Sequence, residues 1–293
     1  FLGGTKNDGL NQSNLRINYA DDSRGEVFLD SSGNIYVATC TRSNNMPITP
    51  SAAQSTLSGD QEAYVAKFNS DLTTLLAATY LGGSEDDAAY SIKIDGSGKV
   101  FVCGGTHSSN FPTTAGTYDN SYNGGISDGF IARYNNTLTS MERATLLGTN
   151  EYDQSYFLDL DDEDFVLTVG QTEGDYPISP NVYSNANSGL YIQKFNNDLT
   201  NSIWSTTIGN GNGHPNITPS AFLVDICNRI YVSGWGGAVN STVQGSTTLG
   251  MPTTSDAFQA STDGSDFYLM ALDENADELV YATFFGGSGI DEH

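Results

Sequence analysis

One sequence, SIKIDGSGKVFVCGGT (residues 91–106), recurs in four variants along this chain of 293 residues. EVFLDSSGNIYVATCT (26–41) lies 65 residues earlier, FLDLDDEDFVLTVGQT (157–172) lies 66 residues later, and AFLVDICNRIYVSGWGG begins at Ala221. Each copy continues into a proline turn (MPIT, FPTT, YPIS or MPTT), then a segment such as DGFIARYN, and closes with a segment such as LLAATYLGG. The chain therefore consists of tandem units, which must bury one another to be stable.

Each unit predicts four short strands. Residues 91–95 and 99–104 are apolar or alternate in polarity, and the Asp-Gly-Ser-Gly between them is a typical turn sequence. Residues 129–135 and 143–147 predict the third and fourth strands, and no long stripe with helical spacing occurs. Four-stranded units of this length are typical of β-propeller blades; a solenoid is the alternative. We predict an all-β propeller with four visible blades of about 65 residues, at approximately 26–83, 91–149, 157–210 and 221–287.

We expect residues 1–293 to form a single β-propeller region. The chain opens inside one closing segment, FLGG, and stops just after another, FFGG, so residues 1–4 and 288–293 would belong to adjoining blades. This favours part of a larger propeller, since propellers usually hold about four to eight blades. A closed four-bladed ring is the alternative.

The chain is strongly acidic. Lys and Arg number 11 against 35 Asp and Glu, which gives a net charge of −24. Such a surface repels phosphate backbones and anionic lipids, and no apolar run reaches the roughly 18–20 residues that span a bilayer, so we expect neither nucleic-acid binding nor direct membrane insertion. Few Lys and many Asn, Ser, Thr and Gly favour an extracellular location. The three cysteines form no CxxC pair and no even disulfide set.

The motifs YLGGSEDD, IDGSGKVFVCGGT, FPTT and DGFIARYN resemble the SBBP family of bacterial β-propeller repeats. WGG (235–237) and SDFYLMALDENADELVYATFFGGSG (265–289) look like the propeller portion of large secreted surface proteins of gliding bacteria. That resemblance implies further domains of the same polypeptide, such as immunoglobulin-like domains, and a type IX secretion sorting signal. The third copy departs from the pattern, because acidic residues (161–164) replace its glycine-bearing turn.

Carboxylates recur four residues after the glycine pair. This column contains Asp8, Asp87, Asp153 and Asp291, with His214 at the equivalent place in one copy. Converging carboxylates repel each other unless they are protonated or share a cation, so the column is a candidate Ca²⁺ site. The alternative is that each Asp accepts N–H bonds in its own turn, because no DxDxDG loop is present. The acidic run 159–164 also has two interpretations, a cation site or a solvated turn.

Trp235, Gly236 and Gly237 form a candidate binding site, because an aromatic ring beside flexible backbone can stack on a sugar or anchor a partner. Packing of Trp235 between blades is the alternative. Tyr118, Tyr183 and Phe258 share one repeat column and are predicted to lie in the core between blades.

No HExxH, GxSxG or P-loop spacing occurs, and the three histidines are scattered. We therefore expect a non-catalytic extracellular or cell-surface module that serves in adhesion, scaffolding or assembly, with loops on one face binding a protein or a surface glycan. The alternative is a carbohydrate-binding or carbohydrate-active propeller, either a lyase or a hydrolase. No cofactor is expected beyond the candidate calcium ion.

Overall fold

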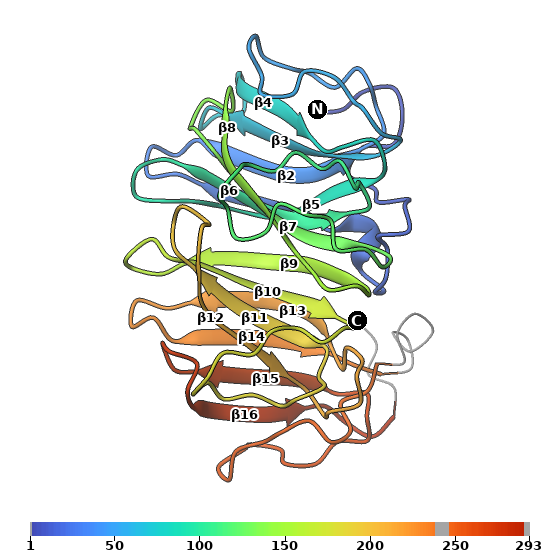
Figure 1. The fold of residues 1–293 in the computed structure, drawn as a ribbon, viewed down its shortest axis with the longest axis vertical. Helices are drawn as coiled ribbons and strands as arrows, with labels where there is room; N and C mark the ends of the chain where they lie inside the picture. The colour runs from blue at the N-terminus through green and yellow to red at the C-terminus, as the bar shows by residue number, and fades with distance from the viewer. Residues whose placement is uncertain (1, 238–245, 290–293) are drawn as a thin grey trace. The chain divides into compact units, whose positions relative to one another are not determined.

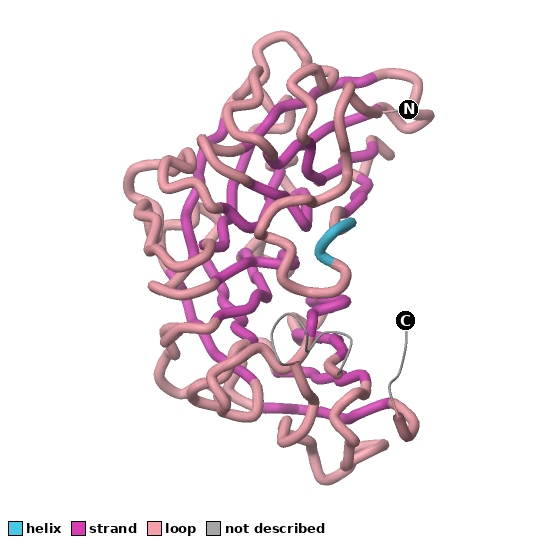
Figure 2. The backbone as a smooth tube through the Cα atoms, turned by 90° about the vertical axis from the view of Figure 1, so that its right-hand side faces the viewer, coloured by secondary structure: helices cyan, strands magenta, loops and turns pink. Residues whose placement is uncertain are grey.

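The computed structural model describes residues 2–237 and 246–289. Within these residues, sixteen strands form four sheets of four, and the strand order within each sheet follows the chain (Figure 1). Their only helical element is the three-residue 3-10 helix η1 (Asp21–Ser23), drawn in cyan in Figure 2. The prediction of an all-β propeller with four-stranded blades is confirmed. No helix in the described part of the chain is long and apolar enough to cross a membrane.

The strands of each blade follow one another in sequence. Blade 1 contains β1 (Glu26–Leu29), β2 (Ile35–Thr41), β3 (Glu62–Phe68) and β4 (Leu75–Leu81). Blade 2 contains β5 (Asp87–Ile94), β6 (Val100–Thr106), β7 (Asp128–Tyr134) and β8 (Met141–Leu147). Blade 3 contains β9 (Asp153–Leu160), β10 (Val166–Thr172), β11 (Leu190–Phe195) and β12 (Ser202–Ile208). Blade 4 contains β13 (Thr218–Val224), β14 (Ile230–Trp235), β15 (Phe267–Leu272) and β16 (Leu279–Phe285).

The chain divides into two compact units. Unit 1 comprises the described residues up to Arg16, Ala20–Leu158 and Asp198–Asn201. Unit 2 comprises Ile17–Tyr19, Asp159–Asn197 and the described residues from Ser202 onward. Blades 1 and 2 thus lie in unit 1, and blade 4 lies in unit 2.

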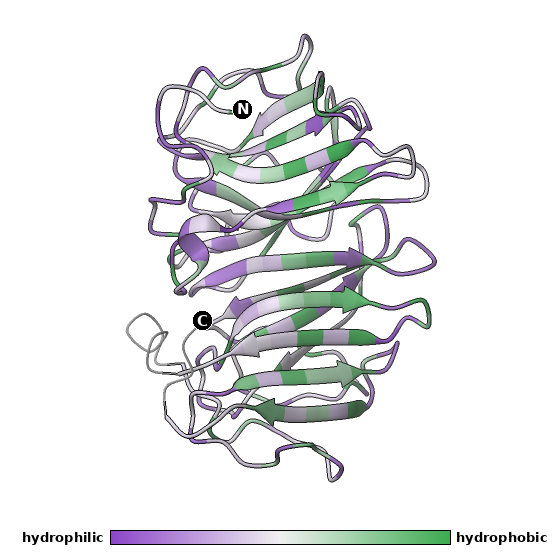
Figure 3. Ribbon diagram, turned by 180° about the vertical axis from the view of Figure 1, so that it is seen from behind, coloured by the Kyte–Doolittle hydropathy of each residue, from purple (hydrophilic) through white to green (hydrophobic). Residues whose placement is uncertain are grey.

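Blades 1 and 2 pack face to face within unit 1. Their shared core includes Tyr36, Val65 and Leu81 of blade 1 and Ile92 and Val102 of blade 2. Figure 3 shows hydrophobic residues gathered on the strands and hydrophilic ones in the loops. A single four-stranded sheet has two faces and cannot cover both, so contact with a neighbouring sheet provides this burial.

An aspartate turn joins the first two strands of every blade. In blade 2, Asp95 Oδ1 accepts hydrogen bonds from Ser97 N at 2.9 Å and Lys99 N at 2.8 Å. The equivalent aspartates of the other three blades accept the same pair of N–H bonds. The third copy keeps this turn without glycine, because Asp164 adopts a left-handed conformation with φ of 61°. A side chain in this region is strained relative to glycine.

The proline turns protect the edge strands. In blade 2, the hydroxyl of Thr114, two residues after the proline, accepts a hydrogen bond from Ala144 N of edge strand β8 at 2.9 Å. Thr49, Ser179 and Thr254 make the same bond in the other blades, at 3.0, 3.0 and 3.2 Å. An unpaired edge strand is a template for aggregation, and these hydroxyls occupy its outward N–H groups.

Candidate functional site

The loops that carry the Asp column meet the loops that follow the second strands. In blade 2, Ser84 N donates to Asn110 Oδ1 and Glu85 N donates to Ser108 Oγ, both at 2.9 Å. The same two contacts recur in blade 1. The two kinds of loop therefore do lie together.

Each described member of the Asp column accepts hydrogen bonds within its own turn. Asp87 Oδ2 accepts bonds from Gly83 N at 2.7 Å and Ser108 Oγ at 3.0 Å. Asp8 and Asp153 each accept the equivalent bond, from the N–H four residues earlier, at 2.6 Å. These bonds fix the turn between one blade and the next.

The remaining members of the column differ. Asp291 lies outside the described residues. His214 is exposed, and its Nδ1 lies 3.1 Å from Glu173 Oε1. Among residues 2–237 and 246–289, no three His, Cys, Asp or Glu side chains are grouped so that they could hold a metal ion.

Two buried carboxyl groups lie next to other acids. Burial raises the pKa of Asp87 to about 7, against the hydrogen bonds that it accepts, and repulsion from Glu62 adds to the rise. Burial likewise raises the pKa of Asp128 to about 8, and Asp153 and Asp119 add repulsion. Both groups carry a proton for part of the time at neutral pH. Sequence reasoning missed Asp128. Its only signal in the sequence is an acid that recurs at the start of the third strand or directly before it in three of the repeats, Glu62, Asp128 and Asp266.

The acidic run 159–164 is divided among separate partners. Asp159 Oδ2 accepts a hydrogen bond from Val224 N at 2.9 Å. Asp161, which is buried, pairs with Lys194 Nζ at 2.7 Å. The two carboxylates therefore contact different partners within unit 2.

Trp235 closes β14 and is buried, with 6 % of its surface exposed. Its ring meets Tyr19 edge to face, with centroids 5.8 Å apart. Gly236 is required here, because a Cβ would lie 2.5 Å from Asn216 O. Gly237 is buried as well, with φ of 138°. The accessible ring at this place is Tyr19, which is 56 % exposed.

Tyr19 belongs to an insertion that sequence reasoning missed. The loop between Asp8 and β1 is about 14 residues longer than the loop between Asp87 and the repeat at 91. In unit 2, its Asn18 exchanges hydrogen bonds with Gln171 and accepts one from Thr218 Oγ1 at 3.0 Å. The length difference was visible in the repeat alignment, although its contacts were not.

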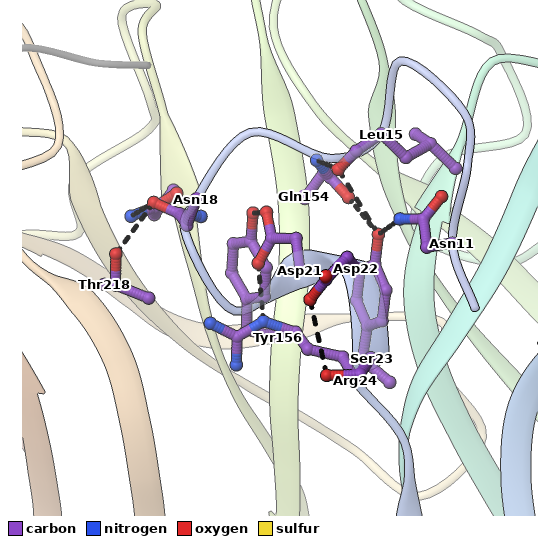
Figure 4. Close-up of polar contacts among 12 residues, drawn as sticks. Asn11, Leu15, Asn18, Asp21, Asp22, Ser23, Arg24, Gln154, Tyr156 and Thr218 are labelled. Atoms are coloured by element: carbon purple, nitrogen blue, oxygen red, sulfur yellow. Dashed lines mark hydrogen bonds and ion pairs between the residues drawn. The ribbon is translucent and has the colours of Figure 1, made fainter. Parts of the chain in front are cut away.

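Within unit 1 the same insertion forms a buried polar network (Figure 4). Asp21 pairs with Arg24 at 2.6 Å and accepts a bond from the Tyr156 hydroxyl at 3.0 Å. The Arg24 guanidinium lies 4.5 Å from the centre of the Tyr156 ring, a cation–π contact. Gln154 donates to Leu15 O at 2.8 Å. Burial raises the pKa of the Tyr156 phenol well above its ordinary value, so this group stays protonated.

One face of blade 4 is apolar and open. A hollow of about 570 Å³ lies on it, lined by residues that include Leu223, Tyr231, Leu269 and Tyr281. Phe285 and Phe258 lie beside one another, with ring centroids 6.3 Å apart, and both are exposed. The prediction that Phe258 and Tyr118 lie in the core is wrong, because both side chains project from loops and are exposed.

A second hollow, of about 510 Å³, lies on unit 1 beside the aspartate turns of blades 1 and 2. Its lining includes Asp30, Asn34, Lys67 and Asn136. Lys67 Nζ lies 3.7 Å from Asp30 Oδ2 and 4.8 Å from the centre of the Tyr36 ring. These groups can donate and accept hydrogen bonds from a polar ligand.

No protein-family model and no curated protein matches this sequence. Similar solved structures include an ulvan lyase of a new family of polysaccharide lyases, bound to -[GlcA(1-4)Rha3S]-. It is 13 % identical with a TM-score of 0.44, over 96 % of this chain and 59 % of the lyase chain. BamB from Moraxella catarrhalis is 14 % identical with a TM-score of 0.32, over 96 % of this chain and 76 % of BamB. This chain thus spans less than two thirds of the lyase. Similarity at this level carries no information about activity.

Proposed function

We propose that this chain is a non-catalytic β-propeller module of an extracellular or cell-surface protein that serves in assembly, scaffolding or adhesion. The observation that carries the proposal is the open apolar face of blade 4, where Leu223, Leu269 and Phe285 are exposed side by side with the hollow. Contiguous exposed apolar surface on a folded protein marks an interaction site. The extracellular location rests on the composition and on the SBBP resemblance.

Docking on this face would be worth several kcal/mol. Complete burial of one Leu or Phe side chain contributes about 1.5–3 kcal/mol. Three such side chains, each roughly half exposed, therefore supply about 3–4 kcal/mol before the cost of association is counted. Two of the groups with shifted pKa values, by contrast, are held in structural contacts: Asp87 lies in its turn and Tyr156 in the buried network. This contrast favours a binding role over a catalytic one.

Site-specific photo-crosslinking in cells that produce the whole protein tests the proposal. A photoreactive phenylalanine at position 269 should give one adduct of discrete mass, whether to another protein or to a further copy. The same group at Ile226, an exposed apolar position in the turn between β13 and β14, is the matched control and should give none. Equal labelling at both positions, or none at 269, would refute docking on this face.

Carbohydrate binding is the second candidate, favoured by the polar hollow on unit 1. A glycan array probed with the wild-type chain and with Asn136→Ala tests it, because Asn136 lines the hollow from an exposed position. A signal that the variant loses supports a sugar site there. A signal that Trp235→Ala loses instead would move the site to the Tyr19–Trp235 pair.

A further inference from the structure

The polar hollow of unit 1 is formed by turns of blades 1 and 2. The turn between β1 and β2 contributes Asp30 and Ser31, and the turn between β5 and β6 contributes Asp95 and Gly98. Asn136 comes from a third turn, between β7 and β8. The volume of about 510 Å³ falls within the range of roughly 300–1,000 Å³ that is typical of small-molecule sites. The hollow is therefore large enough for a small ligand.

The corresponding turns of blades 3 and 4 are bridged by side chains within unit 2. Asn228 Nδ2 donates to Asp162 Oδ1 at 2.6 Å, and Asp162 N donates to Asn228 Oδ1 at 3.2 Å. Ser31 takes the position of Asp162 in blade 1, and Gly98 takes the position of Asn228 in blade 2. Gly98 has no side chain, and the Ser31 hydroxyl makes no hydrogen bond within the described residues. Unit 1 thus lacks the bridge at the place where its hollow lies.

Lys67 lines the hollow with hydrogen-bond donors that the fold does not use. In blade 3 the equivalent Lys194 Nζ lies 2.7 Å from Asp161 Oδ2. In blade 1, Asp30 Oδ2 accepts a bond from Asn34 Nδ2 at 2.8 Å, and Lys67 Nζ lies 3.7 Å from that oxygen. This distance is too long for a hydrogen bond. The Lys67 ammonium therefore donates to no group in the part of the chain that the structure describes.

The rest of the lining is partly polar and partly apolar. The amide of Asn136 is exposed and makes no hydrogen bond among residues 2–237 and 246–289, and an amide can both donate and accept. Ser31 and Ser32 add exposed hydroxyls. Phe28 and Ile94, which pack against the core shared by blades 1 and 2, add apolar surface. A sugar matches this mixture, because its ring has hydroxyl groups at the rim and C–H groups on its faces.

The charges that line the hollow favour a neutral ligand. Lys67 requires hydrogen-bond acceptors, which an ammonium ligand lacks. An anionic acceptor would meet the carboxylates of Asp30 and Asp95 on a chain with a net charge of −24. Hydroxyl groups accept from Lys67 without that repulsion.

We infer that the hollow between blades 1 and 2 binds a residue of a neutral glycan, one without uronic acid or sulfate groups. This inference rests on the second proposed function, carbohydrate binding, and names its ligand class. Lys67 Nζ donates to hydroxyl oxygens of the sugar, and the Asn136 amide donates and accepts beside it. Phe28 provides apolar surface for a C–H face of the ring.

A glycan array that sets neutral glycans beside analogues with uronic acid or sulfate groups, probed with the full chain, tests the inference. Wild type should bind a neutral glycan and not its anionic analogue. Titration calorimetry with that neutral glycan should show an affinity about 10-fold weaker for Asn136→Ala and for Lys67→Met, because each variant removes hydrogen bonds to the sugar. Thr137→Ala, an exposed neighbour of Asn136 outside the lining, is the matched control and should bind like wild type.

A double variant closes the hollow without removing any group that lines it. Ser31→Asp combined with Gly98→Asn copies the bridge of unit 2 and should abolish binding. Asn suits the positive φ of 84° at Gly98, as Asn228 shows with a φ of 60° at the equivalent position. Equal melting temperatures show that all variants fold.

Three results would overturn the inference. Binding of anionic glycans alone, lost in Asn136→Ala, would refute a neutral ligand and leave carbohydrate binding standing. Binding of a neutral glycan that Asn136→Ala, Lys67→Met and the double variant all retain would place the sugar outside the hollow. If no glycan binds, this inference and carbohydrate binding both fail, while a crosslink from position 269 would still support docking on blade 4.

Discussion

Replacement of Asp128 by Asn should make the stability of unit 1 less dependent on pH. Asp128 is the first residue of β7 and is fully buried. Its Oδ2 accepts a hydrogen bond from Asn123 N at 2.8 Å, while its Oδ1 has no hydrogen-bond partner among the described residues. Burial, with repulsion from Asp153 and Asp119, raises its pKa from 3.8 to about 8.

The direction of the effect follows from proton uptake. Between the ordinary pKa of 3.8 and the folded-state value of about 8, the unfolded chain carries an ionised Asp128 and the folded chain a protonated one. The wild type therefore loses stability as pH rises through this range, by at most about 1.4 kcal/mol per pH unit, and levels off above it. Solvent screening near the turn reduces this contribution, so we expect Asp128 alone to account for a loss of about 2 kcal/mol between pH 5 and pH 9.

Urea unfolding of the wild type and of Asp128→Asn at intervals between those two pH values measures the effect. The stabilities of the two proteins should lie close together at the acid end, and the variant should be the more stable by about 2 kcal/mol at the alkaline end. Asp225→Asn is the control, because hydrogen bonds from Arg229 N and Cys227 N lower the pKa of Asp225. That variant should be destabilised by the same amount across the whole range. A constant difference between wild type and Asp128→Asn would refute the reasoning.

Three further predictions concern the turns and the edge strands. Asp164→Gly should raise the free energy of unfolding by about 0.5–1 kcal/mol in urea titrations, because it relieves the left-handed strain; a destabilised variant would contradict this. Thr114→Val should lower the free energy of unfolding by about 1–2 kcal/mol, because Ala144 N loses its acceptor. An unchanged urea midpoint would show that this hydrogen bond contributes nothing to stability. Addition of EDTA at fixed ionic strength should leave the melting temperature unchanged, because Asp8 and Asp87 already accept bonds in their turns. A fall of several degrees would show that a divalent cation stabilises the protein and would contradict this prediction.

The turns and strands could be predicted from sequence because their causes are local. Asp95 and its counterparts bond to N–H groups two and four residues onward, so the same short sequence makes the same turn in each copy. The third copy shows the strength of this effect, since Asp161 forms the turn even where the glycine is missing. The Pro-x-Thr recurrence was equally visible. Its role was not, because it depends on which strand of the sheet lies at the edge.

Whether a candidate side chain is accessible depends on partners that lie far from it in the sequence. Trp235 looked available beside two glycines, yet it contacts Tyr19 from an insertion more than 200 residues earlier in the chain. Phe258 shares a repeat column with other aromatics and was predicted to be buried, yet it is exposed beside Phe285. No periodicity in a single sequence reports such pairings.

The sequence alone determined the number of repeats, their four-stranded pattern and the chemistry of their turns. These features depend on hydrogen bonds between near neighbours and on alternating polarity, which act over a few residues. Only the tertiary structure decided which apolar surfaces are covered. Val65 and Leu269 occupy the same place in the repeat, and one is buried while the other is open, because burial depends on whether another sheet lies against that face.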